Sequence, residues 1–359
     1  MSGQGAVRRY PSVDALRGLT VAAMLLVNNP GEWGHVWWPL EHSAWNGCTP
    51  TDLIFPMFLF IAGVSIALGV APRAISGADR AVLTRTVWVR ALRIVGLGLL
   101  LHLLAWWWLD KPHFRPWGVL QRIGLCFALA GSVAIWCRAR TQWALIALLL
   151  AGWAGLLWLG GSLAPWHNLA SRVDTALLGP LLYEYDPATG LGHDPEGLLS
   201  TLGALATTLL GLRAGDWLRS GKASWLGVGG VACALLGWLW SGWLPLNKNL
   251  WTSSYVLWCA GLSMLLLALA HFLVDRRGWP ALGRSFGVNA IAAYAGSALM
   301  VYALLALDLW TPLYEQGFVR WIAPLAGREV ASAAFAVVFV AIWWVIVRWM
   351  DRRGWHIKI

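Results

Sequence analysis

Charged side chains are scarce in this sequence. Asp, Glu, Lys and Arg make up 12% of the 359 residues, whereas 58% are hydrophobic, and the mean hydropathy is +0.61. An ordinary soluble domain is not this apolar. The five cysteines stand singly and mostly within apolar segments, so they predict neither a disulfide framework nor a metal site. The composition therefore predicts a membrane protein that needs no metal.

Several catalytic motifs are missing as well. The sequence has no G-x-x-x-x-G-K-[ST] phosphate loop, no G-x-G-x-x-G, no H-E-x-x-H and no G-x-S-x-G. ATP hydrolysis, zinc proteolysis and serine hydrolysis therefore lose support. The alternating strands of an outer-membrane barrel are also absent, because the apolar runs are apolar on every face. A helical bundle is the preferred architecture.

Long apolar runs, by contrast, recur along the whole chain. Most approach the roughly 20 residues that an α-helix needs to cross a bilayer. The N-terminus lacks the small-residue cleavage site of a signal peptide, so we expect the first span to be retained. We predict an all-α integral membrane protein, a single domain over residues 1–359, with about ten transmembrane helices at approximately 12–29, 52–71, 90–108, 118–137, 142–163, 196–213, 224–243, 250–274, 286–307 and 330–349.

The basic residues are distributed unevenly about these spans. The net charge is +10. If the N-terminus is cytoplasmic and the spans alternate, most of the 27 Lys and Arg residues fall in cytoplasmic segments. The positive-inside rule then favours both termini in the cytoplasm. The lipid bilayer therefore accounts for the charge, and we expect no nucleic-acid partner.

The sixth span has a clear predicted start and a small-residue face. Asp194 suits the N-cap position and Pro195 the first helical position. Gly203, Thr207 and Gly211 recur every four residues, which predicts close packing against a neighbouring helix. Such faces also leave a homodimer open.

Ionisable side chains inside spans are costly and usually face a partner or a cavity. Asp14 and Arg17, three residues apart, either pair with each other or leave Arg17 to hold an anionic ligand. Arg93 and Arg122 lie on helices otherwise rich in Leu, Gly and Ala, where a cation needs a side-chain partner or a ligand phosphate. Lys248 stands in "LPLNKNLWTSS", which is either a binding site or an interfacial anchor.

The stretch "EHSAWNGCTPTDLIFP", residues 41–56, places polar groups directly before an apolar run. His42 is the strongest catalytic candidate, since histidine exchanges a proton near neutral pH. A lone histidine at a membrane interface is more often a hydrogen-bonded surface group. Here, however, Asn28 ends the preceding span and Asn46 follows closely, and amide groups beside a histidine suit acyl transfer. Trp45 is either an interface anchor or a platform for a sugar ring.

Two segments carry a family resemblance. "SVDALRGLTVAAMLLVNN" and "HSAWNGCTPTDLIFPMFLFIAG" closely resemble the first two signature segments of the heparan-α-glucosaminide N-acetyltransferase family. Further matches are "GVLQRIGLC", "DPEGLLSTLGALATTLLG", "PLNKNLWTSSYVLWCAG" and "GVNAIAAYAGS". The resemblance extends over nearly the whole chain. It implies that an acetyl group passes from cytoplasmic acetyl-CoA to a sugar on the other side of the membrane, with the family's active-site histidine at His42 and its partner asparagine at Asn28.

These observations lead to one functional hypothesis. We expect a multi-pass protein of the bacterial inner membrane that transfers acetyl groups from acetyl-CoA to an amino sugar or oligosaccharide in the periplasm, to nitrogen or oxygen. His42 is the predicted general base, and Asn28 orients it or stabilises the oxyanion. The other predicted contacts are Arg17, Arg93, Arg122, Lys248 and Asn247 for the donor, and Trp45, Asn46 and Asp52 for the acceptor.

The alternative is a secondary transporter for N-acetylglucosamine-like sugars. Such carriers commonly show inverted repeats and helices that are broken near the midplane of the membrane. No internal duplication is evident in this sequence, and His42 lies at the rim of the predicted bundle rather than at its midplane. The enzyme is therefore the preferred interpretation.

Overall fold

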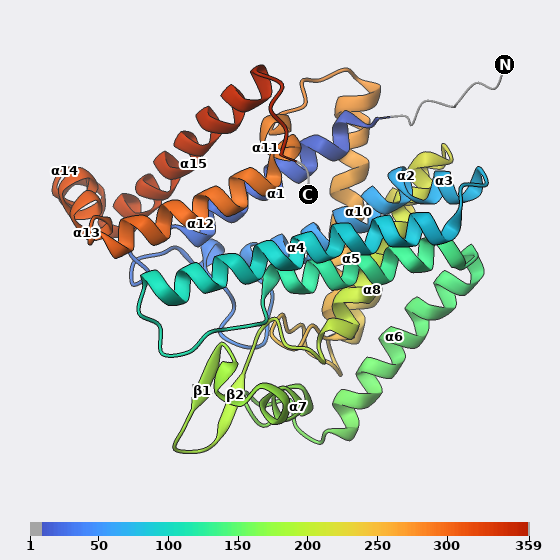
Figure 1. Cartoon of the computed structure of the whole chain (residues 1–359), viewed down its shortest axis with the longest axis horizontal. Helices are drawn as coiled ribbons and strands as arrows, with labels where there is room; N and C mark the ends of the chain where they lie inside the picture. The colour runs from blue at the N-terminus through green and yellow to red at the C-terminus, as the bar shows by residue number, and fades with distance from the viewer. Residues whose placement is uncertain (1–8, 358–359) are drawn as a thin grey trace.

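The computed structural model describes residues 9–357, and most of them are helical. Figure 1 shows the helices, which are α1 Pro11–Asn28, α2 Ile54–Gly69, α3 Ala71–Ile75, α4 Arg80–Trp108, α5 Val119–Trp136, α6 Ala139–Leu159, α7 Leu169–Leu178, α8 Thr201–Arg219, α9 Ser224–Trp240, α10 Ser253–Ala270, α11 Arg284–Val288, α12 Ala290–Ala306, α13 Trp310–Tyr314, α14 Arg320–Ala326 and α15 Arg328–Arg352. Short 3₁₀ turns occur at Trp38–Leu40, Thr51–Leu53 and Gly179–Leu181, and π-helical turns at His271–Arg276 and Glu315–Val319. Strands β1 Glu184–Asp186 and β2 Leu191–His193 form an antiparallel hairpin in which Glu184 lies opposite His193.

Six helical segments of the described chain are long and apolar enough to cross a membrane. They are Thr51–Ile75, Arg80–Trp108, Val119–Trp136, Ala139–Leu159, Ser253–Arg276 and Arg328–Arg352. A seventh is the pair Ala290–Ala306 and Trp310–Ala326, which is bent by 99° and forms either a broken span or a re-entrant loop. The protein is thus an all-α membrane protein. The ten-span arrangement and the cytoplasmic termini remain predictions.

Close contact between α2 and α8 forms the centre of the bundle. A Cβ atom on Gly63 of α2 would collide with the carbonyl oxygen of Thr208, and one on Gly211 of α8 would collide with that of Phe60. The two backbones therefore touch, which only glycine permits at these positions. The predicted small-residue face is confirmed, since Gly203 on the same helix also lies against the backbone of Trp251.

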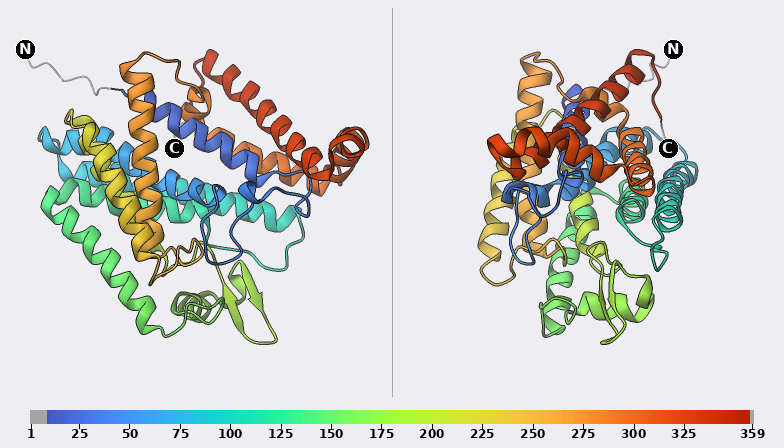
Figure 2. Two further views of the ribbon diagram at one scale, coloured as in Figure 1. Left: turned by 180° about the vertical axis from the view of Figure 1, so that it is seen from behind. Right: turned by 90° about the vertical axis from the view of Figure 1, so that its left-hand side faces the viewer.

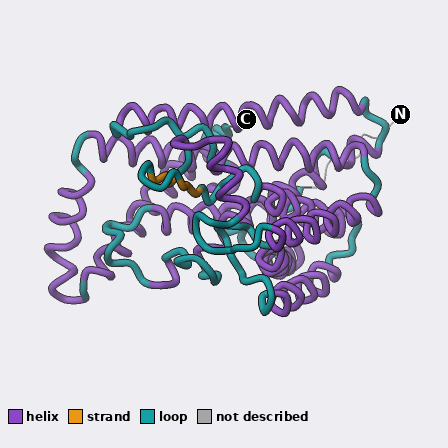
Figure 3. The backbone as a smooth tube through the Cα atoms, turned by 90° about the horizontal axis from the view of Figure 1, so that it is seen from below, coloured by secondary structure: helices purple, strands orange, loops and turns teal. Residues whose placement is uncertain are grey.

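The remaining helices surround this pair. In Figure 1, α4 and α5 lie side by side, α12 contacts both α1 and α4, and α6, α8 and α10 reach down to a lobe made of α7 and the β1–β2 hairpin. The same lobe projects at the bottom of both views in Figure 2. The view from below in Figure 3 shows the strands among a cluster of loops. Loops therefore gather at this end of the molecule, and the loop that contains His42 is one of them.

Candidate active site and donor cavity

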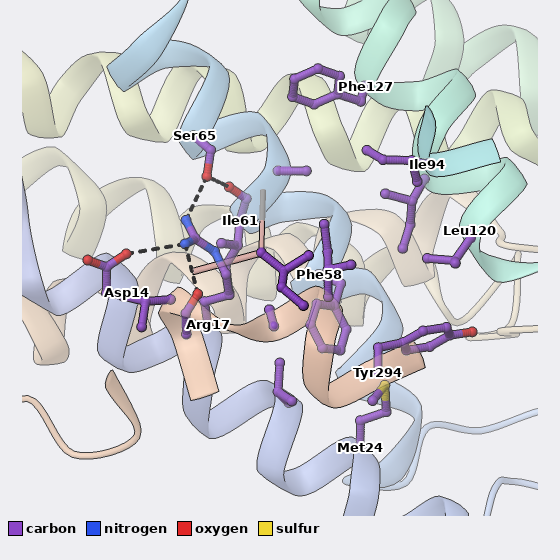
Figure 4. Close-up of a pocket in the computed structure, with 18 of the residues that line it drawn as sticks. Asp14, Arg17, Met24, Phe58, Ile61, Ser65, Ile94, Leu120, Phe127 and Tyr294 are labelled. Atoms are coloured by element: carbon purple, nitrogen blue, oxygen red, sulfur yellow. Dashed lines mark hydrogen bonds and ion pairs between the residues drawn. The ribbon is translucent and has the colours of Figure 1, made fainter. Parts of the chain in front are cut away.

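A cavity of about 540 Å³ lies between α1, α2, α4, α5, α11 and α12. Most of its wall is apolar, as Figure 4 shows for Met24, Phe58, Leu120 and Tyr294. Its polar side chains come from the first half of α1, the last turns of α2, the first half of α4, and the ends of the described chain: Arg9, Asp14, Arg17, Ser65, Arg90 and His356. The cavity is therefore cationic at one end and apolar along its length.

Arg17 is held at the polar end by three groups. Its Nη1 donates to Asp14 Oδ1 at 3.2 Å and to the Gly287 carbonyl oxygen at 3.3 Å, and its Nη2 donates to Ser65 Oγ at 2.9 Å (Figure 4). Arg9 Nε donates to the second oxygen of the same carboxylate at 2.8 Å. The predicted pairing of Asp14 with Arg17 is present. One carboxylate shared by two guanidinium groups leaves positive charge for an anionic ligand.

Arg90, not Arg93, lines this cavity. Both residues are exposed overall, but the Arg90 guanidinium lies 5.1 Å from the ring centroid of Phe127, another residue of the wall, and Arg93 is not among the lining residues. Arg90 is one helical turn before Ile94, which also lines the cavity. Sequence reasoning did not identify Arg90 as a residue of this wall.

Arg122 has protein partners rather than a position in the cavity wall. Its side chain is fully buried, and its Nη2 donates to the Gly197 carbonyl oxygen at 2.7 Å and to Ser200 Oγ at 2.5 Å. Its guanidinium also lies 5.1 Å from the ring centroid of Trp251. These contacts fasten α5 to the segment that precedes α8. The geometry favours the side-chain-partner alternative over a donor phosphate.

His42 and Asp52 form a pair at the other end of α1 and α2. His42 Nδ1 lies 2.7 Å from Asp52 Oδ1, and the Asp52 side chain is 1% exposed. Asp52 Oδ2 accepts the backbone N–H groups of Ser43 at 3.1 Å and Thr49 at 3.0 Å. The Tyr255 hydroxyl donates to the Asp52 carbonyl oxygen at 2.6 Å. Asp52 is therefore fixed on both its backbone and its carboxylate.

This geometry changes the interpretation of Asp52, which the sequence suggested as an acceptor ligand. Its carboxylate is enclosed and fully used by protein donors, so it orients His42 instead. A ring that donates its Nδ1–H to Asp52 keeps Nε2 as a proton acceptor. Because the His42 side chain is 46% exposed, that nitrogen is accessible to a substrate. The pair has the form of a general base and its orienting carboxylate.

Lys248 and Asn247 also lie beside His42, not at the cationic end of the cavity. Lys248 Nζ is 3.1 Å from His42 Nδ1 and 3.2 Å from Nε2. Asn247 Nδ2 donates to Asn46 Oδ1 at 3.0 Å, and Asn247 Oδ1 accepts the Leu250 N–H at 2.8 Å. The amide pair joins two loops about 200 residues apart. Sequence reasoning grouped Lys248 and Asn247 with the donor phosphates because it had no means of detecting this contact.

Trp45 and Asn28, two other predicted site residues, differ in their contacts. Trp45 Nε1 donates to the Leu163 carbonyl oxygen at 2.9 Å, and its ring meets that of His193 at 5.2 Å between centroids. Trp45 therefore fastens the His42 loop to the lobe.

Asn28, the last residue of α1, is exposed, and in the part of the chain that the structure describes no hydrogen bond joins it to His42. Its catalytic role remains a prediction.

The lobe next to the site contains buried polar groups. Ser171 Oγ and His193 Nδ1 are 2.9 Å apart, and Asp174 Oδ1 accepts the N–H groups of Leu198 at 3.1 Å and Leu199 at 3.3 Å. Burial raises the pKa of Asp174 to about 6 and lowers the pKa of His193 to about 4. Across residues 9–357, no group of three or more His, Cys, Asp or Glu side chains is arranged to hold a metal ion.

Comparison with known proteins shows similarity to one group of enzymes. The family model described as "Heparan-alpha-glucosaminide N-acetyltransferase, catalytic" matches residues 9–175. This segment includes most of the cavity wall and the His42–Asp52 pair. The human heparan-alpha-glucosaminide N-acetyltransferase is 29% identical over 80% of this chain, and the mouse protein is 29% identical over 83%. The chain is therefore similar to the heparan-α-glucosaminide N-acetyltransferases, both in the segment matched by the family model and over most of its length.

The chain spans about half the length of the curated relatives that it matches. The alignment takes in 52% of the human N-acetyltransferase and 54% of the mouse N-acetyltransferase. In this chain, the segment matched by the family model holds His42, Asp52, Arg17 and Arg90, while Lys248 comes from a later segment. The two candidate centres are therefore formed largely, but not entirely, by the family's catalytic region.

Proposed function

We propose that this protein is a transmembrane acetyltransferase of the bacterial inner membrane, as its similarity to the heparan-alpha-glucosaminide N-acetyltransferases suggests. It moves an acetyl group from cytoplasmic acetyl-CoA to an amino sugar or glycan in the periplasm, with His42 as the general base. One observation carries the proposal: a cationic cavity lies at one end of α1 and α2, and a His–Asp pair lies at their opposite end. The positive-inside rule predicts that the cationic end is the cytoplasmic one.

The cavity suits the two parts of a coenzyme A thioester. Arg9, Arg17 and Arg90 supply guanidinium groups for phosphates, which Arg binds well because its donors match phosphate oxygens. The apolar wall suits the long and flexible pantetheine arm. Asn28 lies eleven residues after Arg17, or about 16 Å along α1 at the helical rise. A donor whose phosphates bind near Arg17 thus points its arm towards the loop that carries His42.

His42 Nε2 then accepts a proton from the acceptor's amine or hydroxyl as that group attacks the thioester carbonyl carbon. The tetrahedral adduct collapses, the carbon–sulfur bond breaks, and the departing sulfur takes up the proton from the imidazolium. Asp52 holds the ring throughout, since its hydrogen bond to Nδ1 fixes both tautomer and orientation. Asn46 is exposed and lies in the same loop as His42, so it is the candidate contact for the acceptor.

Proteoliposomes test this proposal directly. Vesicles that contain the protein with its predicted cytoplasmic side inward are loaded with labelled acetyl-CoA and offered external glucosamine or glucosamine oligosaccharides. We expect label on the external sugar, and label that appears about 10²- to 10⁴-fold more slowly with His42→Ala. Accumulation of unmodified sugar inside the vesicles, with no label transferred, would support the transporter alternative instead.

A further inference from the structure

The position of Lys248 over the His42 ring is unusual. Its Nζ is almost equally far from the two ring nitrogens, at 3.1 and 3.2 Å. The lone pairs of the two nitrogens point outward in the ring plane in different directions, so an atom equidistant from both lies along neither. The ammonium therefore lies over the face of the imidazole. It leaves the in-plane lone pair of Nε2 available to an acceptor.

The charge of Lys248 is only weakly matched by the protein. Within the described residues its one ion pair is the 3.9 Å contact to Asp52 Oδ1, an oxygen that already binds His42. The Lys248 side chain is 14% exposed. Burial lowers the pKa of Lys248, while Glu196 and Asp52 act in the opposite direction and Arg122 adds to the lowering. A partly buried cation with this environment is suited to an anionic partner that arrives with the substrate.

We infer that Lys248 stabilises the oxyanion that forms on the acetyl carbonyl when the acceptor attacks beside His42. This inference rests on the proposed acetyl transfer. As the acceptor nitrogen or oxygen bonds to the carbonyl carbon, the π electron pair moves to the carbonyl oxygen and the acceptor proton moves to His42 Nε2. Lys248 keeps its own proton and donates a hydrogen bond to that oxygen until the carbon–sulfur bond breaks and the carbonyl reforms.

Position separates Lys248 from the other candidates for this task. Asn28, which the sequence suggested, is exposed and has no hydrogen bond to His42 among residues 9–357. Arg17 and Arg90 line the cavity at its far end. Lys248 alone among these cations is within hydrogen-bonding distance of the ring nitrogens.

Steady-state kinetics of Lys248→Met and Lys248→Arg in proteoliposomes test the inference. Loss of one oxyanion donor typically lowers kcat by about 10²- to 10³-fold. We expect a loss of this size for Lys248→Met, with the KM for acetyl-CoA and the affinity for CoA unchanged, and a smaller loss for Lys248→Arg. A raised KM for acetyl-CoA with normal kcat would overturn the inference, because it would place Lys248 at the donor phosphates.

A chemical rescue separates charge from packing. Lys248→Cys is alkylated either with 2-bromoethylamine, which restores an ammonium at nearly the original length, or with iodoacetamide, which adds a neutral amide. Wild-type protein treated in the same way controls for the five native cysteines. Recovery of kcat with the ammonium alone supports the inference. Equal recovery with both reagents, or no recovery in a protein that still binds CoA, contradicts it.

Different results would overturn the role of Lys248 and the proposed function. If the wild-type protein transfers acetyl groups and Lys248→Met has the same kcat, the inference about Lys248 is wrong and the proposed function stands. If the wild-type protein transfers no acetyl group from acetyl-CoA to any glucosamine acceptor, the proposed function itself is wrong.

Discussion

His42 and Asp52 are ten positions apart in the chain, and the loop between them turns back so that their side chains meet. Several hydrogen bonds hold this turn. Thr49 Oγ1 donates to the Glu41 carbonyl oxygen at 2.6 Å, and the Gly47 N–H donates to the Leu246 carbonyl oxygen at 2.8 Å. Gly47 has a φ of 122°, a conformation that glycine adopts most easily. His42 is therefore positioned by a loop held by hydrogen bonds rather than by a helix.

Removal of the His42 imidazole tests the base directly. Loss of a general base typically costs about 10²- to 10⁴-fold in rate. We expect His42→Ala to lower kcat for acetyl transfer by this factor while CoA binding is retained, since the cavity wall does not include His42. His35 is a matched control, because it lies in the same loop and pairs with Glu32 rather than with Asp52. If His35→Ala and His42→Ala lose the same activity, the assignment of the base is wrong.

Asp52→Asn separates orientation from charge. An amide cannot replace the carboxylate for all of its donors, so the ring loses its fixed tautomer and Ser43 and Thr49 lose part of an acceptor. We expect kcat to fall by at least about tenfold, by analogy with the loss of the carboxylate from a catalytic triad. Thermal unfolding followed by tryptophan fluorescence is expected to show lower stability, by about 1–3 kcal/mol. The neighbouring exposed Glu41→Gln is the control, and normal turnover in Asp52→Asn would contradict the orienting role.

Arg17 and Arg90 form a matched set with Arg93. The first two line the cavity, and Arg93, on the same helix as Arg90, is exposed outside it. We expect Arg17→Ala and Arg90→Ala to raise the KM for acetyl-CoA by about 10- to 100-fold, since loss of a hydrogen bond to a charged group costs about 1.5–3 kcal/mol. Arg93→Ala is expected to leave it unchanged. A raised KM for Arg93→Ala alone would instead favour the position chosen from the sequence.

The residues that sequence reasoning located and those it misplaced differ in one respect. His42 stands in a distinctive local motif, and Arg17 is three residues from its partner, so both were predictable from short stretches of sequence. The positions of Lys248 and Asn247 beside His42 depend on a contact across about 200 residues. A local pattern identifies polar residues near a helix start, but it does not reveal which distant loop they meet.

At the scale of elements, the start of α8 differs from the prediction. The helix begins at Thr201, whereas the Asp194–Pro195 signal predicted a start near residue 196. Asp194 does accept the Glu196 N–H at 2.9 Å, but its carboxylate also binds Arg115, with Nη2 to Oδ1 at 2.5 Å. Arg115 Nη2 bonds Glu196 Oε2 at 2.7 Å too. The pairing with Arg115 holds residues 194–196 against the loop between α4 and α5, so the helix starts later.

The buried carboxyl of Asp174 makes the stability of the lobe depend on pH. Its pKa rises from an ordinary value of 3.8 to about 6 because burial penalises the charged form. The folded protein thus holds this proton more tightly than the unfolded chain, and the group contributes less stability as pH rises from about 4 to about 6. His193, whose burial lowers its pKa to about 4, has the opposite effect over an overlapping range.

Asp174→Asn removes the first of these effects. The amide oxygen still accepts the N–H groups of Leu198 and Leu199, but it never ionises. As pH increases from 4 to 7, we expect the unfolding free energy of the variant to increase relative to that of the wild type by an amount of the order of 1 kcal/mol. The unfolding temperature of the variant should rise relative to that of the wild type over the same range. The test is thermal unfolding in detergent at several pH values. A difference that stays constant over this range would show that Asp174 does not titrate there.

At the scale of the molecule, the proposed function places the two substrates on opposite sides, one at the cavity and one at the His–Asp pair. The cationic lining of the cavity comes from Arg9 just before α1, Arg17 in the first half of α1 and Arg90 in the first half of α4, while Asp52 precedes the first residue of α2. The apolar runs and the asymmetry of basic residues predicted this division, and the helices supply its scaffold. What the sequence did not specify is the path between the centres, because it depends on side chains from six packed elements.

This division predicts a one-sided response to inhibitors. Desulfo-coenzyme A carries the phosphates of the donor but no thiol, and it does not cross membranes. In proteoliposomes of uniform orientation, we expect it to inhibit transfer only from the side on which Arg9, Arg17 and Arg90 are accessible, while glucosamine acceptors are used only from the other side. An acceptor analogue that lacks the amine or hydroxyl to be acetylated gives the reciprocal control. Equal inhibition from both sides would contradict the arrangement, because a cavity that opens to both compartments would not keep the donor and the acceptor apart.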